Sequence, residues 1–277
     1  MTRRDVISVI AASAATAAAQ EPKPRKGRLK QCVTRGVFGR GAQLEDMCRN
    51  AAKMGVVGFD LIGPADFPLL KKYGLIPTMV PGAMTLTGGC NQVEDHAAVE
   101  KAMRALIDQA AAVKAPNVIV LSGNRRGLSD EKGADNVVAF LNKVKTQAED
   151  KGVTLCMELL NSKVNHPDYQ CDHTAWGVDV CKRVASPHVK LLFDIYHMQI
   201  MEGDIIRTIK ANLQWIAHFH TAGNPGRHEM DDTQEMNYKG IAKAIADSPF
   251  QGYVAHEYSP TRDPLQSLEE TLTMFEA

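Results

Sequence analysis

The sequence predicts an α/β fold, a single (β/α)8 barrel, and three observations support this. Short apolar runs alternate eight times with segments of helical period, from about residue 29 to the end of the chain. The spacing of the last four runs fits one strand–helix unit each. No composition break divides this part of the chain, and its length is typical of one such barrel. A doubly wound open sheet is the alternative, but no GxGxxG follows the first strand.

The strands are expected where the apolar runs are short and bounded by turn residues. They are residues 29–36, 56–62, 75–80, 117–122, 153–159, 188–195, 214–220 and 252–258. The expected helices are residues 44–54, 68–73, 93–113, 132–151, 174–184, 200–212, 238–246 and 264–275. The glycine-rich segment 81–91 is read either as a loop that closes over a ligand or as a disordered surface loop.

Polar side chains stand at the ends of the last four apolar runs. They are Glu158, Asp194, His220 and Glu257. A single residue of these types is usually a helix cap or a hydrogen-bonded core residue. Because the C-terminal ends of barrel strands meet at one face, we expect the four to converge there. Three carboxylates and one imidazole suit a divalent ion such as Mn²⁺, Mg²⁺ or Co²⁺.

The N-terminal segment reads as a targeting signal rather than as part of the barrel. In residues 1–20, Arg3 and Arg4 precede an alanine-rich apolar run, which resembles a twin-arginine export signal. The run is too short and too weakly apolar to span a membrane. Residues 21–28 are polar with two prolines and are expected to be a linker, which leaves residues 29–277 for the barrel domain. The expected location is the periplasm; the alternative is a cytoplasmic protein with a disordered tail.

Charge and cysteine content restrict the partners. The chain has 32 Lys and Arg against 32 Asp and Glu, and no basic block, so nothing favours binding to nucleic acid. A barrel endonuclease would also need more metal-binding histidines. The six cysteines show no metal-like spacing and are expected in the core. If the protein is exported, a disulfide such as one between Cys171 and Cys181 would be compatible with the sequence.

Three segments contain residue combinations that general packing rules do not explain. They are FDIYHMQIMEGD, HFHTAGNPGRHE with EMNY after it, and GYVAHEYSP. They resemble the hydroxypyruvate isomerase family, which belongs to the xylose-isomerase-like sugar isomerase and epimerase barrels. The resemblance covers essentially residues 29–277 and is dense from Glu158 to Pro260. It implies an acid and base pair, Glu158 and Glu257, and metal ligation by these two with Asp194 and His220. A homo-oligomer is compatible with it.

The resemblance also implies that His197 and Arg227 contact the substrate's oxygens. A loop arginine paired with Glu229 is the simpler alternative for Arg227. His218 shares a strand face with His220, His256 points the other way, and both are expected to be structural.

The chain departs from the family pattern at three positions. Leu159 stands where the glutamate on the fifth strand is usually followed by proline, and Asp60 stands where the second strand often ends in glutamate. His220 is the residue of ketose 3-epimerases, whereas hydroxypyruvate isomerases often have glutamine. The last two departures leave the substrate open between a hydroxy-keto acid and a sugar.

Three functions follow. The first is a metal-dependent isomerase that works through an enediolate, with hydroxypyruvate to tartronate semialdehyde as the named case. The second is a ketose 3-epimerase on free sugars. The third is a non-catalytic sugar-binding barrel, which the presence of all four strand-end residues disfavours.

Overall fold

The computed structural model describes residues 25–277, in which eight parallel strands form one sheet. The strands are β1 (Lys30–Val33), β2 (Gly58–Asp60), β3 (Ile76–Met79), β4 (Asn117–Val120), β5 (Thr154–Glu158), β6 (Val189–Asp194), β7 (Ile216–Thr221) and β8 (Tyr253–His256). Each lies inside or within one residue of a predicted apolar run. The predicted α/β barrel is confirmed in this part of the chain.

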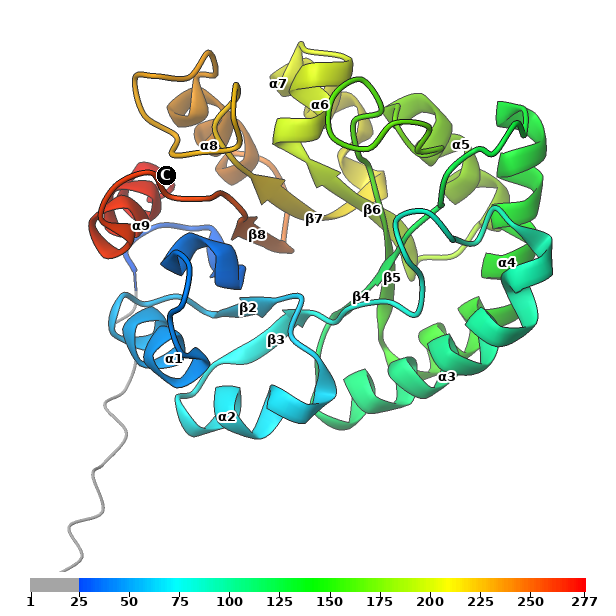
Figure 1. Ribbon diagram of the computed structural model, residues 1–277, viewed down its shortest axis with the longest axis horizontal. Coiled ribbons are helices and arrows are strands. Elements are labelled where there is room, and N and C mark those ends of the chain that lie inside the picture. Colours follow the sequence, from blue (N-terminus) through cyan, green and yellow to red (C-terminus); the bar gives the residue numbers. More distant parts are fainter. Residues whose placement is uncertain (1–24) are drawn as a thin grey trace, which may run out of the picture.

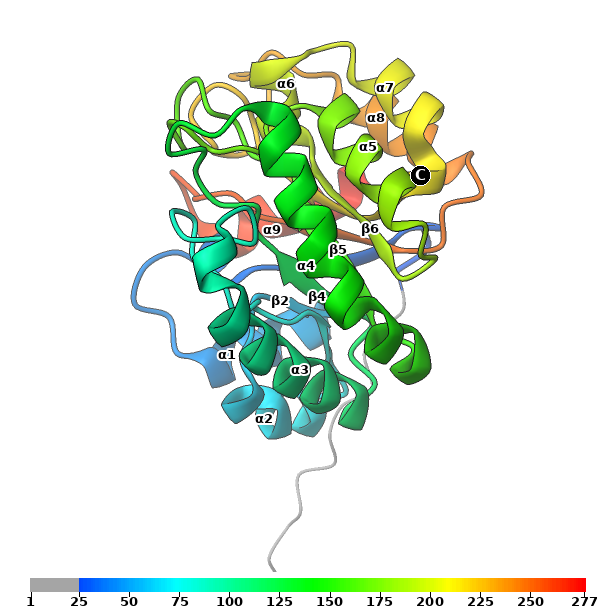
Figure 2. The same ribbon diagram turned by 90° about the vertical axis from the view of Figure 1, so that its right-hand side faces the viewer.

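Helices surround the sheet (Figure 1). They are α1 (Leu44–Lys53), α2 (Phe67–Lys72), α3 (His96–Ala112), α4 (Asp130–Lys151), α5 (Thr174–Val184), α6 (Ile195–Met201), α7 (Ile205–Asn212), α8 (Tyr238–Ala246) and α9 (Pro264–Met274). Short 3-10 turns occupy Arg35–Phe38, Pro64–Asp66, Val93–Asp95 and Leu213–Trp215. The long helices α3 and α4 pack side by side outside β4 and β5 (Figure 2).

The strand order closes the sheet into a barrel. It runs β3-β2-β1-β8-β7-β6-β5-β4, and a parallel bridge between Val80 and Val118 joins the two outer strands. The open-sheet alternative is therefore wrong. Both faces of such a sheet are buried, which explains why the strands read as continuous apolar runs instead of alternating ones. The closed barrel gathers the C-terminal ends of all eight strands at one mouth.

One predicted helix is wrong in its bounds. The segment expected as a single helix over 200–212 is two helices, α6 and α7. The first begins earlier because the Asp194 side chain accepts the His197 backbone N–H at 3.1 Å and caps the helix directly after β6. The chain then turns at Gly203 and Asp204, whose φ angles are +66° and +46°. Left-handed backbone ends a helix, and glycine adopts it without steric cost.

The remaining predictions about the chain concern its N-terminus and its cysteines. The proposed export signal, residues 1–20, lies outside the described residues. Residues 25–28, assigned to the linker, lie against the C-terminal end: Arg25 donates to Glu276 at 2.9 Å, and the Arg28 N–H donates to the Ala277 carbonyl. All six cysteines are buried free thiols, so no disulfide joins Cys171 to Cys181. Within residues 25–277, no helix combines the length and apolar character that crossing a membrane requires.

Candidate metal centre and active site

The four polar residues predicted at strand ends lie together at the mouth of the barrel. Glu158 and Asp194 are the last residues of β5 and β6, His220 lies near the end of β7, and Glu257 directly follows β8. One potential ligand atom from each lies within 4.8 Å of the others. Metal–ligand bonds of about 2.0–2.6 Å would place such atoms around a common centre. We call these four residues the acidic cluster.

The His220 ring is oriented as a metal ligand would be. Its Nε2 lies 2.9 Å from Asp60 Oδ2, and because a carboxylate only accepts, Nε2 carries the proton. Nδ1 lies 2.7 Å from Glu257 Oε2 and 3.4 Å from Glu158 Oε1, yet it makes no aligned hydrogen bond with any described residue. An unpaired buried nitrogen among carboxylate oxygens fits a divalent ion.

The charges in the acidic cluster also favour a cation. Burial raises the pKa of Glu158 and of Asp194. Burial has the same tendency at Glu257, but the charges of His220 and Arg227 outweigh it and lower its pKa to about 2. Burial would lower the pKa of His220, yet Glu257 and Asp60 hold it well above the usual range. The carboxylates that hold a proton on His220 also attract other positive charge, so a bound metal ion would replace that proton.

Asp60, at the end of β2, supports the cluster from inside the barrel. Its Oδ2 accepts from His218 Nε2 at 2.6 Å and from His220 Nε2, and its Oδ1 accepts from the Thr78 hydroxyl. Burial would raise the pKa of Asp60, and the two histidines outweigh it and lower that pKa. From the sequence, Asp60 stands out only as a departure from a family pattern. The signal that identified the four cluster residues, a polar side chain at the end of a strand, also applies to Asp60.

His197 is brought to the same site in the same Nε2–H tautomer as His220, but it turns this N–H toward the cluster, whereas His220 turns its Nδ1 there. Asn161 Oδ1 accepts the backbone N–H groups of Val164 and Asn165, so its Nδ2 must be the atom that lies 2.5 Å from His197 Nδ1. His197 Nδ1 therefore accepts, and its Nε2 carries the proton. That Nε2 is fully buried, has no partner among the described residues, and lies 3.6 Å from Asp194 Oδ2. It is a free donor at the edge of the acidic cluster.

Arg227 lies over the cluster. Its Nη2 donates to Glu257 Oε2 at 2.8 Å and lies 3.5 Å from Asp194 Oδ2, while its guanidinium covers the Tyr196 ring. The alternative pairing with Glu229 is wrong, because Glu229 instead accepts from the backbone of Thr261.

His256 lies away from the acidic cluster, between Thr221 and Gln31. This agrees with the structural role expected for it.

A cavity of about 400 Å³ opens beside the acidic cluster. Its polar lining is Glu158, His166, Arg227 and Glu257, and its apolar lining comes from β4 and from the segments after β2, β3, β4 and β5. A second cavity, of about 370 Å³, shares Leu61, Arg227 and Glu257 with the first. His166 was not predicted from the sequence; its ring centroid lies 5.2 Å from that of His197.

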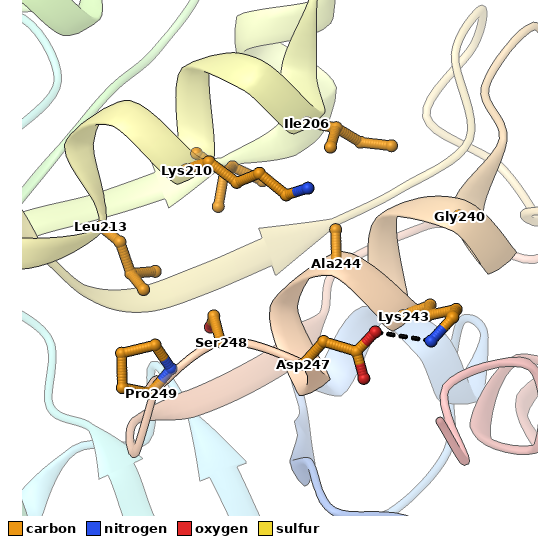
Figure 3. Close-up of a pocket in the computed structure, with 10 residues that line it drawn as sticks. Ile206, Lys210, Leu213, Gly240, Lys243, Ala244, Asp247, Ser248 and Pro249 are labelled. Carbon is orange, nitrogen blue, oxygen red and sulfur yellow. Dashed lines mark hydrogen bonds and ion pairs between the residues drawn. The ribbon is translucent and has the colours of Figure 1, made fainter.

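A groove of about 500 Å³ lies elsewhere, between α7 and α8 (Figure 3). Ile206, Leu213 and Ala244 form part of its lining, and Lys243 pairs with Asp247 at its edge. No residue of the acidic cluster lines it.

Comparison with known proteins identifies the family. A sequence model described as the xylose isomerase-like TIM barrel matches residues 68–277. The chain belongs to this family. The match includes Glu158, Asp194, His220 and Glu257, and it begins at helix α2. The resemblance inferred from the three sequence segments is therefore confirmed at the level of the family.

Curated proteins to which the chain is similar are isomerases by name. The chain is 34% identical over 113 residues to the 2-oxo-tetronate isomerase of Cupriavidus necator, which covers 41% of this chain and 43% of that protein. It is 35% identical over 105 residues to the hydroxypyruvate isomerase of Escherichia coli (strain K12), covering 37% and 40%. The chain thus spans less than half the length of either relative in these alignments.

Solved structures share the fold. A structure titled AP endonuclease, family 2, from Brucella melitensis superimposes with a TM-score of 0.78, at 23% identity, covering 88% of this chain and 98% of that one. The D-psicose 3-epimerase of Clostridium cellulolyticum H10, with D-tagatose, gives a TM-score of 0.74 at 18% identity, covering 90% and 100%. At these identities the likeness concerns the fold alone.

Proposed function

We propose that the chain is a metal-dependent isomerase of α-hydroxy carbonyl compounds that works through an enediolate. The conversion of hydroxypyruvate to tartronate semialdehyde is the reference reaction. The observation that carries the proposal is the convergence of Glu158 and Glu257 on the unpaired Nδ1 of His220. The names of the two curated isomerases support it.

The acidic cluster supplies the groups that this reaction needs. Glu158, Asp194, His220 and Glu257 would hold the divalent ion. When bound, the ion would stabilise the negative charge that develops on the substrate's oxygens. Glu158 and Glu257 come from β5 and β8, on different sides of the mouth, and each carries two oxygens. One carboxylate can therefore remove the proton from the hydroxyl-bearing carbon beside the carbonyl. The hydroxyl proton moves to the former carbonyl oxygen, and either carboxylate returns a proton to the former carbonyl carbon.

His197 and Arg227 would hold the substrate's oxygens during this transfer. Because Asn161 donates to His197 Nδ1, His197 can offer only the N–H of Nε2, so it acts as a donor to a carbonyl or enediolate oxygen. Arg227 adds a positive charge beside Glu257.

Epimerisation of a ketose is the second candidate, favoured by a histidine at position 220. It uses the same enediolate but returns the proton to the opposite face of the same carbon.

Deuterium exchange tests both candidates. The 277-residue protein with Mn²⁺ is incubated in deuterated water with hydroxypyruvate, ketoses or aldoses, and carbon-bound deuterium is followed by NMR. Label beside a carbonyl in an isomerised product supports the isomerase, and label at carbon 3 of a ketose supports the epimerase. Metal binding without label on any substrate would contradict both and favour a sugar-binding barrel.

We also propose that residues 1–20 direct export. Replacing Arg3 and Arg4 by lysine should keep the protein in the cytoplasm of a bacterial host, as measured by cell fractionation. Unchanged delivery to the periplasm would contradict a twin-arginine signal.

A further inference from the structure

His166 differs from the other polar side chains that line the 400 Å³ cavity. Glu158 and Glu257 belong to the acidic cluster. Arg227 donates to Glu257 at 2.8 Å and lies 3.5 Å from Asp194, so its charge is also engaged there. Among the described side chains of this lining, His166 is the polar one that remains to contact the part of a substrate that does not react.

The loop after β5 holds His166 at the cavity. The His166 backbone N–H donates to the Asn161 carbonyl at 3.1 Å, and its carbonyl accepts from the Tyr169 N–H at 3.1 Å. The side-chain oxygen of the preceding Asn165 accepts from Asn161 Nδ2 at 2.7 Å and from the Tyr196 hydroxyl at 3.0 Å. Because the backbone is fixed on both sides of His166, its ring has a defined position, as a binding residue requires.

The ring of His166 is available to a ligand. Within residues 25–277 its hydrogen bonds are those of the backbone, which leaves both ring nitrogens for the cavity. Burial lowers the pKa of His166 and the charge of Arg227 lowers it further, while Asp194 and Glu257 act in the opposite direction. The ring is therefore neutral at pH 7, with one nitrogen that donates and one that accepts. A hydroxyl group, which also donates and accepts, is its complementary partner.

The ring also lies beside the group that would bind a reacting oxygen. Its centroid is 5.2 Å from that of His197, whose Nε2–H is the free donor at the edge of the acidic cluster. Two side chains this close contact neighbouring parts of one small molecule. Both reacting oxygens of a substrate would lie within the acidic cluster, so the group that reaches His166 belongs to a carbon beyond the reacting pair.

The cavity has room for such a carbon. At roughly 30 Å³ for each non-hydrogen atom, the volume that water takes in the liquid, a cavity of about 400 Å³ holds about a dozen atoms. The reacting carbons and their oxygens are a minority of these. We propose that His166 binds a hydroxyl group on the carbon next to the reacting pair, and so selects polyhydroxy substrates that carry one there. This rests on the proposed function, which places the reacting carbons between Glu158 and Glu257.

Two three-carbon ketones that differ only at this carbon test the proposal. Dihydroxyacetone carries a hydroxyl group there and hydroxyacetone a methyl group, while the reacting pair is the same in both. Each is titrated by calorimetry into the Mn²⁺-loaded 277-residue protein, so the readout is binding rather than turnover. Dihydroxyacetone should bind about fivefold more tightly, the effect of one neutral hydrogen bond.

Variants of His166 assign this preference to the ring. His166→Phe keeps a ring of similar size without the nitrogens, and it should lower the ratio of the two dissociation constants about fivefold through weaker binding of dihydroxyacetone. The statistical advantage of the two equivalent ends of dihydroxyacetone is the same in each protein and cancels. His166→Gln, whose amide donates and accepts, should restore most of the ratio.

His188→Phe is the matched control. Like His166, His188 is a partly exposed histidine, but it directly precedes β6, at the opposite end of that strand from Asp194, and it lines neither cavity. The ratio of the two dissociation constants should not change in this variant.

The outcomes separate this proposal from the proposed function. An unchanged ratio in His166→Phe, including a fall of both affinities alike, overturns it, as does no binding of either ketone or a ratio that His166→Gln fails to restore. An equal loss of the ratio in His188→Phe overturns it as well. A ratio that depends on His166 in samples that incorporate no deuterium leaves it standing and contradicts the isomerase. Deuterium incorporation with a ratio independent of His166 does the reverse.

Discussion

The two halves of the barrel mouth differ in chemistry although both are built from strand ends. Strands β5 to β8 carry Glu158, Asp194, His220 and Glu257 at or next to their C-terminal ends, while residues at and after the ends of β2, β3 and β4 present mainly aliphatic side chains to the adjoining cavity. Asp60 is the exception in the first half, and its carboxylate faces the histidines of β7. Under the proposed function, the charged half would serve proton transfer, and the aliphatic half would face the part of the substrate that does not react.

The comparison extends to stability. The aliphatic half is stabilised by burial, at about 25 cal/mol for each Å² of apolar surface removed from water. The acidic half places several carboxylates out of water beside one another, which opposes folding unless positive charge is supplied. Sites that carry out proton transfer commonly sacrifice stability in this way.

The largest effect is expected from the two glutamates of the acidic half. Glu158→Gln and Glu257→Gln should each lower deuterium incorporation by about 10³-fold, because an amide cannot transfer the proton. Glu270→Gln is the control, since Glu270 is an exposed residue of α9 that pairs with Arg262. Incorporation within a few-fold of the unaltered protein in both cluster variants would contradict the assignment of the acid and base pair.

Asp60→Asn tests the one carboxylate that the first half contributes. We expect Mn²⁺ affinity, measured by calorimetry, to fall about 10- to 100-fold, because an amide oxygen is a weaker, uncharged acceptor for the N–H that fixes the His220 tautomer. Asp66→Asn removes an exposed carboxylate that pairs with Arg35 and should leave the affinity unchanged. Unchanged affinity in Asp60→Asn would mean that His220 is oriented by other contacts.

Asn161→Asp should affect catalysis and leave metal binding intact. The new carboxylate still accepts from the backbone of Val164 and Asn165, but it can no longer donate to His197 Nδ1. The ring should then carry a proton on Nδ1, visible in its ¹⁵N chemical shifts, and kcat/KM should fall about tenfold. Asn212→Asp is the distant control. Unchanged ring shifts would contradict the role assigned to Asn161.

The smallest expected effect concerns stability without metal. Glu158→Gln should raise the free energy of unfolding of the metal-free protein by about 1 kcal/mol in urea at pH 7, because it removes one charge from the buried cluster. Added Mn²⁺ should stabilise the unaltered protein more than this variant. A variant less stable than the unaltered metal-free protein would show that the charge of Glu158 is already compensated.

Much of the architecture could be predicted because its signals are local. Apolar runs and helix stops such as Gly152 mark the element boundaries, and a polar residue at the end of a buried strand indicates the mouth of a barrel. The prediction of a single helix over 200–212 was wrong for two reasons. Asp194 caps a helix immediately after β6, so helical structure begins earlier than predicted, and the left-handed backbone at Gly203 interrupts it.

The sequence by itself determined the barrel, the family and the residue types at the four strand ends. Only the tertiary structure decided how those residues are used. One oxygen of Asp60 accepts from both His218 and His220, which lie more than 150 residues away along the chain. Asn161, in another segment, determines which ring nitrogen of His197 carries the proton. The 400 Å³ cavity likewise joins side chains from or after β2, β3, β4 and β5. Such contacts depend on barrel closure and on ring orientation, which no local periodicity encodes.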